Sequence, residues 1–106
     1  MLGLEVSRTK FMNTGMLQFE HTLLLKGVDE ELGFSTLKEW PFLPIKGTFI
    51  TLFQGGPSIE IECVFVNQEI TSGTVELVAL DVSKRSAPIF IDYKDALLAS
   101  GWQIAF

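Results

Sequence analysis

Three short runs of β-branched and aromatic residues constrain the fold of this chain more than any other feature. They occupy residues 46–53, 59–66 and 73–82, and Gly, Pro, Ser and Asn residues separate them. Runs of this composition joined by turn-forming residues are typical of consecutive antiparallel strands. The stretch from Lys46 to Val82 therefore predicts a three-stranded meander around which the rest of the chain must pack.

Two links join the strands of this meander. The first, residues 54–58, holds two glycines and a proline and predicts a five-residue hairpin loop. The second, residues 71–73, predicts a three-residue loop in which Gly73 takes the left-handed position beside a bulge. The middle strand would then extend to Ile70.

Two of these strands are apolar on both faces over part of their length. The middle strand changes its apolar face along its length, and in the last run Val78, Leu80 and Val82 share the face of Glu76. The residues of the middle strand are Ile59, Ile61, Cys63 and Phe65 on one face, then Val64, Val66 and Ile70 on the other. Strands of this kind are covered on both faces. The cover would come from strong bending into a barrel, from a helix, or from another subunit.

The chain is expected to form one domain. Its 106 residues, 47% of them hydrophobic, suffice for a single core without disulfides or metals. Residues 1–15 have only scattered apolar side chains and are expected to form a flexible N-terminal arm before a β-rich domain at 16–106. Residues 17–26 alternate regularly and predict a strand with one buried face, which carries His21.

Residues 28–47 are expected to form a long connection rather than a strand. Single helical turns are predicted at Asp29–Leu32 and after Ser35, whose hydroxyl would cap the second turn. The segment from Trp40 to Ile45 must then run extended, because prolines stand at positions 41 and 44. We expect this apolar segment to cross an open end of the sheet and cap the core.

The end of the chain predicts a short helix followed by a last strand. Asp92 stands in the N-cap position and Gly101 in the C′ position, although a start nearer Pro88 would place Ile89, Tyr93 and Leu97 in one core-facing stripe. Residues 102–106 then alternate and predict a strand that ends in a buried Phe106.

These elements predict a β-dominated α+β domain: a small, strongly bent antiparallel sheet or an SH3/OB-like barrel of about five strands, with one short C-terminal helix. The spacing Pro44-x-x-Gly47 ahead of three strands, a helix and a final strand resembles small SH3-like and OB-like barrels. This resemblance concerns the fold, and a fold alone implies no function.

Composition argues against several classes of partner. Thirteen acidic against eight basic residues give a net charge of −5, which repels nucleic acid and anionic membrane surfaces. No run reaches the roughly 18 to 20 apolar residues of a membrane helix. The N-terminus also lacks the pattern of a secretory signal, so we expect a cytoplasmic protein.

The chain contains few candidates for chemistry. His21 and Cys63 are its only histidine and cysteine, too few for a zinc site, and we expect both to be buried structural residues rather than a nucleophilic pair. Glu60 and Glu62 share a strand face about 7 Å apart and are interpreted as a solvated face rather than a carboxylate pair. No metal, cofactor or catalytic residue is predicted.

The aromatic residues Trp40, Phe42 and Trp102, together with His21, are the candidate binding residues. Most large aromatic side chains in small domains pack in the core. Any that stay exposed would form a patch of the kind that protein partners bind.

The sequence thus favours a non-enzymatic binding or protein-interaction module over an enzyme. Its partner would be another protein or a second copy of the chain, with a homodimer favoured. The alternative is a barrel that binds a small ligand, or an enzyme that uses His21. A deep pocket that includes His21 would favour this alternative.

Overall fold

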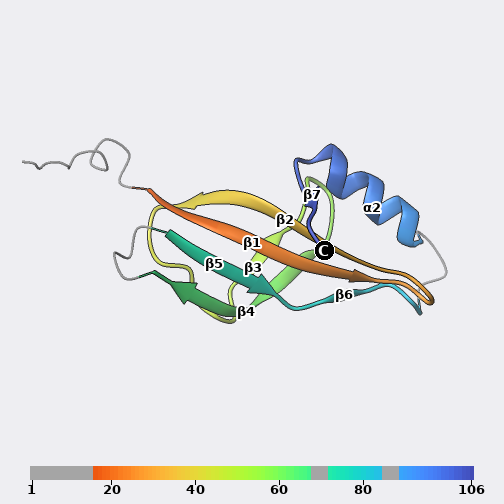
Figure 1. Cartoon of the computed structure of the whole chain (residues 1–106), viewed down its shortest axis with the longest axis horizontal. Helices are drawn as coiled ribbons and strands as arrows, with labels where there is room; N and C mark the ends of the chain where they lie inside the picture. The colour runs from red at the N-terminus through yellow and green to blue at the C-terminus, as the bar shows by residue number, and fades with distance from the viewer. Residues whose placement is uncertain (1–15, 68–71, 85–88) are drawn as a thin grey trace, which may run out of the picture.

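The computed structural model describes residues 16–67, 72–84 and 89–106. The predicted arm at 1–15 and the predicted end of the middle strand at Ile70 lie outside these ranges. The described residues form seven strands and one helix (Figure 1): β1 (Leu17–Lys26), β2 (Glu31–Trp40), β3 (Phe49–Thr51), β4 (Ser58–Val66), β5 (Ser72–Leu77), β6 (Leu80–Asp81), α2 (Phe90–Ala99) and β7 (Gln103–Ile104).

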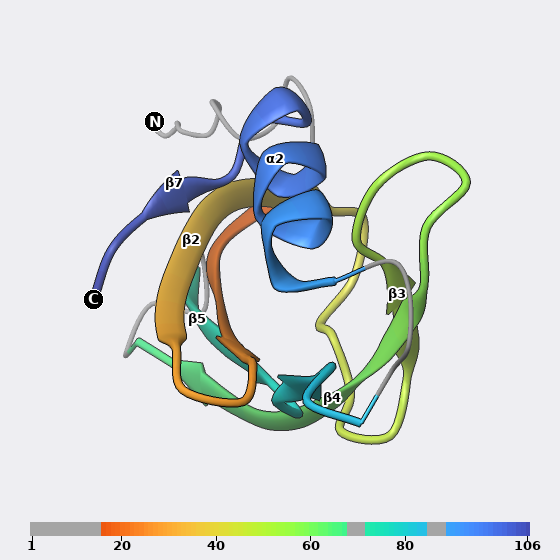
Figure 2. The same cartoon turned by 90° about the vertical axis from the view of Figure 1, so that its right-hand side faces the viewer.

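The strands form one sheet in the order β3-β4-β5-β1-β2-β7, with β6 paired to β1. All neighbours are antiparallel except β1, which runs parallel to β5 and β6. The sheet curls into a half-barrel, and α2 lies over its concave side (Figure 2). The predicted fold class, a strongly bent β-dominated α+β domain with one short helix, is confirmed. The described strands number seven rather than about five.

The meander is present as β3, β4 and β5, which are neighbours in the sheet. Its first link is a hairpin loop, but it spans residues 52–57 rather than the predicted 54–58. In this loop Gly55 has a φ of 78° and Gly56 N–H donates to Phe53 O. The prediction for Gly73 is wrong, because this residue lies inside β5. A Cβ atom there would stand 2.1 Å from the carbonyl oxygen of Phe65, so glycine is required by close packing rather than by a turn.

One extra residue in β4 explains why its apolar face changes. Ile61 pairs with Leu77 and Cys63 pairs with Glu76, so Glu62 forms a bulge. A bulge shifts the alternation of side chains by one position. Before the bulge, Ile61 therefore faces the core. After the bulge, Val64 and Val66 face inward, whereas Cys63 and Phe65 face outward. The prediction that Cys63 shares the face of the buried Ile61 is wrong for this reason.

A matching irregularity separates β5 from β6. Thr22 pairs with Glu76 and Leu25 pairs with Leu80, so the β5–β6 side has one residue more than β1. Leu77 and Leu80 are both buried as a result. Of the three predicted covers, the described residues show two: the strong bending of the sheet, and the helix α2 on its concave side.

The region 28–47 differs most from its prediction. Instead of helical turns at Asp29–Leu32 and Ser35, the chain forms the ten-residue strand β2, whose register with β1 runs from Leu17 opposite Trp40 to Lys26 opposite Glu31. A tight turn, closed by Gly27 N–H donating to Glu30 O over 2.8 Å, joins the two strands. Pairing with β1 thus outweighs the weak local helix signals.

The C-terminal helix agrees with the prediction, and its N-cap is Ile89 rather than Asp92. The Asp92 carboxylate accepts a hydrogen bond from Ile89 N–H at 3.0 Å, and Gly101, with a φ of 98°, ends the helix. Tyr93 and Leu97 are buried, whereas Ile89 is exposed.

The last strand, β7, pairs with β2. Phe106 is 64% exposed, so its predicted burial is wrong. Its ring lies over Gly33, where a Cβ atom would be 2.0 Å from the ring.

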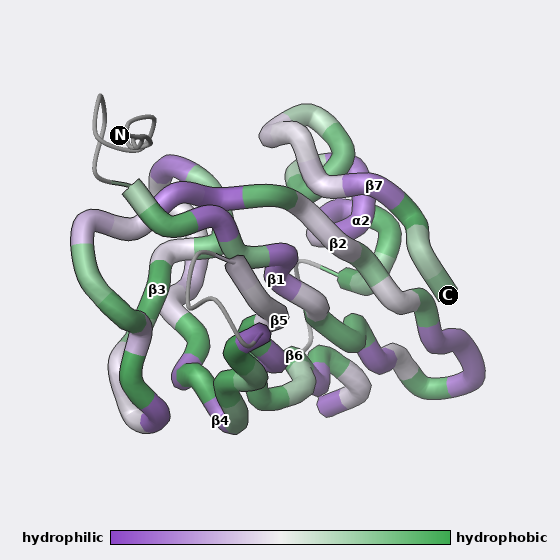
Figure 3. The backbone as a smooth tube through the Cα atoms, turned by 60° about the vertical axis from the view of Figure 1, so that its left-hand side comes forward, coloured by the Kyte–Doolittle hydropathy of each residue, from purple (hydrophilic) through white to green (hydrophobic). Residues whose placement is uncertain are grey.

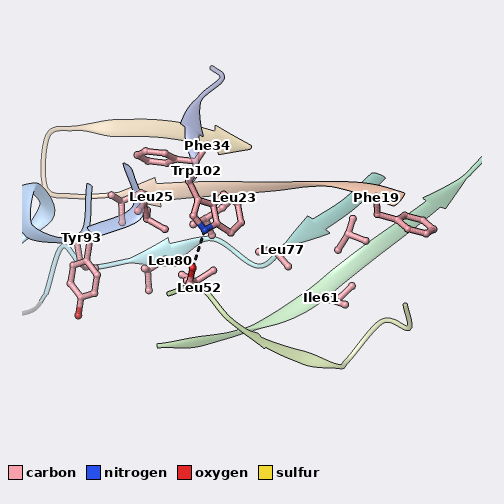
Figure 4. Packing of buried hydrophobic residues seen from close by; sticks show 13 residues of the cluster. Phe19, Leu23, Leu25, Phe34, Leu52, Ile61, Leu77, Leu80, Tyr93 and Trp102 are labelled. Atoms are coloured by element: carbon pink, nitrogen blue, oxygen red, sulfur yellow. Dashed lines mark hydrogen bonds between the residues drawn. The ribbon is translucent and has the colours of Figure 1, made fainter. Parts of the chain in front are cut away.

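The core lies between the concave face of the sheet and α2. Trp102 is among its largest side chains, and its indole N–H donates to the carbonyl of Leu52 at 2.9 Å (Figure 4). This bond joins the segment after α2 to the segment after β3. The buried apolar residues are Phe19, Leu23, Leu25, Phe34, Leu52, Ile61, Val75, Leu77, Leu80, Val82, Tyr93, Leu97 and Trp102.

Candidate functional site

The segment from residue 41 to 48 crosses the half-barrel from β2 to β4. Two strands, β1 and β5, separate β2 from β4 in the sheet, and the segment spans them on the concave side (Figures 1 and 2). Its far end is fixed to β4, because Gly47 N–H donates to Ile61 O at 2.9 Å and Ile61 N–H donates to Thr48 O at 2.8 Å. The segment therefore crosses the open end as predicted.

The same segment caps the core only in part. Pro44 is buried, but Phe42 and Ile45 are 63% and 65% exposed, and Leu43 is exposed as well. Phe49, at the start of β3, is 63% exposed. Figure 3 shows hydrophobic stretches on this loop and on β3. We call the four exposed side chains Phe42, Leu43, Ile45 and Phe49 the loop surface.

The near end of the segment is held by a pair of rings. Trp40, the last residue of β2, donates its indole N–H to Nε2 of His21 on β1 at 3.2 Å. The two ring planes are within 4° of parallel, with centroids 5.9 Å apart. Nδ1 of His21 lies 3.1 Å from the carbonyl oxygen of Phe19. Because an indole can only donate, Nε2 must accept, and the His21 proton resides on Nδ1 and is donated to Phe19.

His21 is fully buried and uncharged near neutral pH. Burial lowers its pKa from 6.5 to about 4; the hydrogen bond to Phe19 opposes this shift, and the positive charge of Lys38 adds to it. Both ring nitrogens are occupied in this arrangement. His21 is thus a satisfied buried residue, with neither nitrogen free for a substrate.

The structure brings three of the four candidate binding residues together. Trp40 is half-buried between His21 and Phe42, and it meets the Phe42 ring edge-on with centroids 6.3 Å apart and planes at 67°. Trp102 lies apart from them in the core. Phe42 is the only one of the four that is mainly exposed.

The remaining side chains considered for chemistry are Cys63 and the acidic residues. Cys63 faces the convex side of the sheet while His21 faces the concave side, so they form no nucleophilic pair. No group of three His, Cys, Asp or Glu side chains within the described ranges is placed to hold a metal ion. In the same part of the chain, no helix has the length and apolar character needed to cross a membrane.

Two open hollows flank α2. One, of about 620 Å³, lies between the β1–β2 turn and the start of the helix and includes Asp29, Glu31, Phe90 and Lys94 in its lining. The other, of about 390 Å³, lies between α2 and the loop at 53–57. Neither hollow is lined by His21 or Trp40, so the small-ligand alternative gains no pocket at His21.

Leu43, Ile45 and Phe49 were not among the sequence-based site candidates. The sequence predicts Leu43 and Ile45 in a core cap and Phe49 in a strand. The sequence does carry a signal for the exposure of the loop side chains: residues 40–45 form an apolar run around two prolines and lack the alternation of a strand. Such a run cannot bury all of its side chains on one face. Comparison with protein-family models, with curated proteins and with solved structures finds no match.

Proposed function

We propose that this chain is a small non-enzymatic protein-interaction module that binds another polypeptide through the loop surface. The observation that carries the proposal is the exposure of four large apolar side chains within eight residues, three on a loop fixed at both ends and one at the start of β3. Exposed apolar patches of this kind mark interaction sites, and aromatic side chains dominate the energetics of binding.

The anchoring of the loop matters for affinity. The Trp40–His21 hydrogen bond fixes one end, and the bonds of Gly47 and Thr48 to Ile61 fix the other. A loop held in place before binding loses little conformational entropy when a partner arrives. The apolar side chains of the loop surface are therefore presented in an arrangement ready for contact.

The net charge of the chain indicates the charge that is expected around the contact site of the partner. With a charge of −5, the chain is attracted to a polypeptide whose apolar contact patch has a basic rim. This attraction raises the rate of association and weakens as salt is added.

The test uses a loop variant and a matched control. The Phe42→Ser/Ile45→Ser variant removes two side chains of the loop surface. The control, Val28→Ser, removes an apolar side chain at the β1–β2 turn that is even more exposed. A partner recovered with the unaltered protein from its natural host is purified, and its affinity for each form is measured by calorimetry. We expect the loop variant to lose at least about tenfold in affinity, which corresponds to roughly 1.4 kcal/mol, while Val28→Ser binds normally.

Equal binding by the loop variant and the unaltered protein would refute the proposal. Circular dichroism of each variant confirms that the fold is retained. The alternative, a ligand-binding or catalytic site at His21, predicts that a small molecule displaces Trp40 from His21, which changes the fluorescence of Trp40.

A further inference from the structure

The outer edge of β4 is open along its second half. β3 pairs with Ser58, Ile59 and Glu60, and residues 47 and 48 bond to Ile61. Beyond Ile61 the described ranges place no strand beside β4 on this side. Phe65, at the middle of the open part, is 52% exposed, and Val66 is exposed too.

The backbone groups that this edge presents follow from the pairing on its other side. Asn67 N–H donates to Ser72 O at 3.1 Å, and Phe65 is two residues before Asn67 opposite Thr74. In an antiparallel ladder, alternate residues direct both backbone groups to the same neighbour. Phe65 therefore bonds to β5, and Val64 and Val66 direct their N–H and C=O groups outward.

We propose that two copies of the chain pair antiparallel along this edge, centred on Phe65. In that register Val64 of each copy lies opposite Val66 of the other, and all four outward N–H groups meet outward C=O groups. The two Phe65 side chains lie directly opposite each other on the convex face at a non-hydrogen-bonded position, where side chains approach most closely. The edge is thus complementary to itself.

Charge placement is compatible with this register. The copies of Glu62 lie six residues apart along the paired strands, about 20 Å, so their repulsion is largely screened. Open edges usually carry prolines or charges that prevent pairing. The segment 63–66 carries neither.

The proposed pairing is separate from the binding proposed for the loop surface. Pairing of one short strand segment buries less than the roughly 1,200 Å² of a typical stable interface. The dimer is therefore expected to dissociate in the micromolar range.

Cysteine substitutions test the register. In a Cys63→Ser background, Phe65→Cys places two thiols across the two-fold axis with Cα atoms about 4.5 Å apart, within disulfide range. Oxidised glutathione accepts the two electrons and two protons of the thiols and leaves as two reduced molecules. The matched Val64→Cys control separates the thiol-bearing Cα atoms by roughly 9 Å, too far for a disulfide.

We expect Phe65→Cys to give a covalent dimer of twice 11.8 kDa and Val64→Cys to stay monomeric on a non-reducing gel. Sedimentation of the unaltered chain across micromolar concentrations should show a monomer–dimer equilibrium that Phe65→Lys abolishes. A monomer at every concentration, cross-linking through Val64→Cys, or no cross-linking through Phe65→Cys would overturn the proposal. So would a dimer that the Phe42→Ser/Ile45→Ser variant abolishes and Phe65→Lys leaves intact. Retention of the dimer by this loop variant distinguishes the β4 edge from the loop surface.

Discussion

The half of the curled sheet under α2 and the half crossed by the β2–β3 loop are covered in different ways. Under α2, the covering elements bury large side chains of their own, Tyr93, Leu97 and Trp102. Across the other half, the covering segment buries Pro44, keeps Trp40 half-buried and leaves Phe42 and Ile45 exposed. A helix satisfies its own backbone groups and can bury a whole face, whereas a loop cannot. The first cover is suited to stability, and the second is suited to recognition.

One tryptophan hydrogen bond holds each cover in place, and the two hydrogen bonds differ in their acceptor. Trp102 donates to the backbone carbonyl of Leu52, which does not titrate. Trp40 donates to the imidazole of His21, which does. The α2 cover is therefore expected to be insensitive to pH, and the loop cover is expected to loosen in acid.

The largest expected effect separates the two tryptophans. Trp102→Ala removes a fully buried side chain and leaves the Leu52 carbonyl without its donor, so it should lower the free energy of unfolding by about 3–5 kcal/mol. Trp40→Ala, at a half-buried site, should cost about half as much. Urea denaturation monitored by circular dichroism measures both. Equal losses would show that the loop cover is as important for stability as the α2 cover.

The next effect concerns acid. The pKa of His21 is about 4 in the folded chain and 6.5 in the unfolded chain, so the unfolded state binds the proton more tightly. The stabilisation is complete above pH 6.5 and is lost as the pH falls towards 4, where the loss reaches about 3 kcal/mol. Protonation also turns Nε2 into a donor that faces the indole N–H of Trp40.

Two measurements check this expectation. Urea denaturation between pH 7 and pH 4 gives the free energy of unfolding, and a Trp102→Phe variant isolates the fluorescence of Trp40. We expect Trp40 to become more exposed to a soluble quencher as His21 is protonated. In a His21→Gln variant, both the acid-dependent loss and the change in quenching should diminish. An unchanged pH profile in this variant would assign the acid sensitivity to other groups.

The sequence predicted the fold class because its strongest signals are local. Strand-forming runs, turn glycines and the alternation around Phe19 identify the meander, the strand at 17–26 and the short helix without knowledge of the tertiary structure. β2 was missed because its alternation is weak: the face that holds Phe34 also holds Thr36 and Lys38 opposite His21 and Phe19. Only pairing with β1 shows that these residues form a strand.

The site was harder to predict than the fold. The sequence identified Phe42 and Trp40 by residue type, but exposure depends on which neighbours cover a side chain. In the sequence, the bulge at Glu62 is visible only as a switch of the apolar side chains from one face of the strand to the other. A strand covered by a second layer would show the same pattern. For the same reason, the outward direction of Phe65 is visible only in the pairing of β4 with β5.

The smallest effect concerns the half of the sheet that the segment 41–48 crosses. It tests whether the strands there are loosely packed, or only the segment that covers them. A Cβ atom at Gly73 would stand 2.1 Å from the Phe65 carbonyl oxygen and 2.7 Å from the Phe19 ring. Both neighbours belong to the sheet, and Phe19 is fully buried. Gly73→Ala should therefore cost about 1–3 kcal/mol, typical of overpacking. At Gly33, the obstructing group is the exposed ring of Phe106, which is free to rotate away, so Gly33→Ala should cost less.

Paired urea denaturations of the two alanine variants decide this point. A larger loss for Gly73→Ala means that the β4–β5 pair under the loop is tightly packed and yields less than the exposed ring of Phe106 does. The exposed side chains of the loop surface would then rest on a rigid base, which favours binding with little rearrangement. The reverse order would mean that the β4–β5 pair yields easily, and a partner of the loop surface would have to order this part of the sheet on binding.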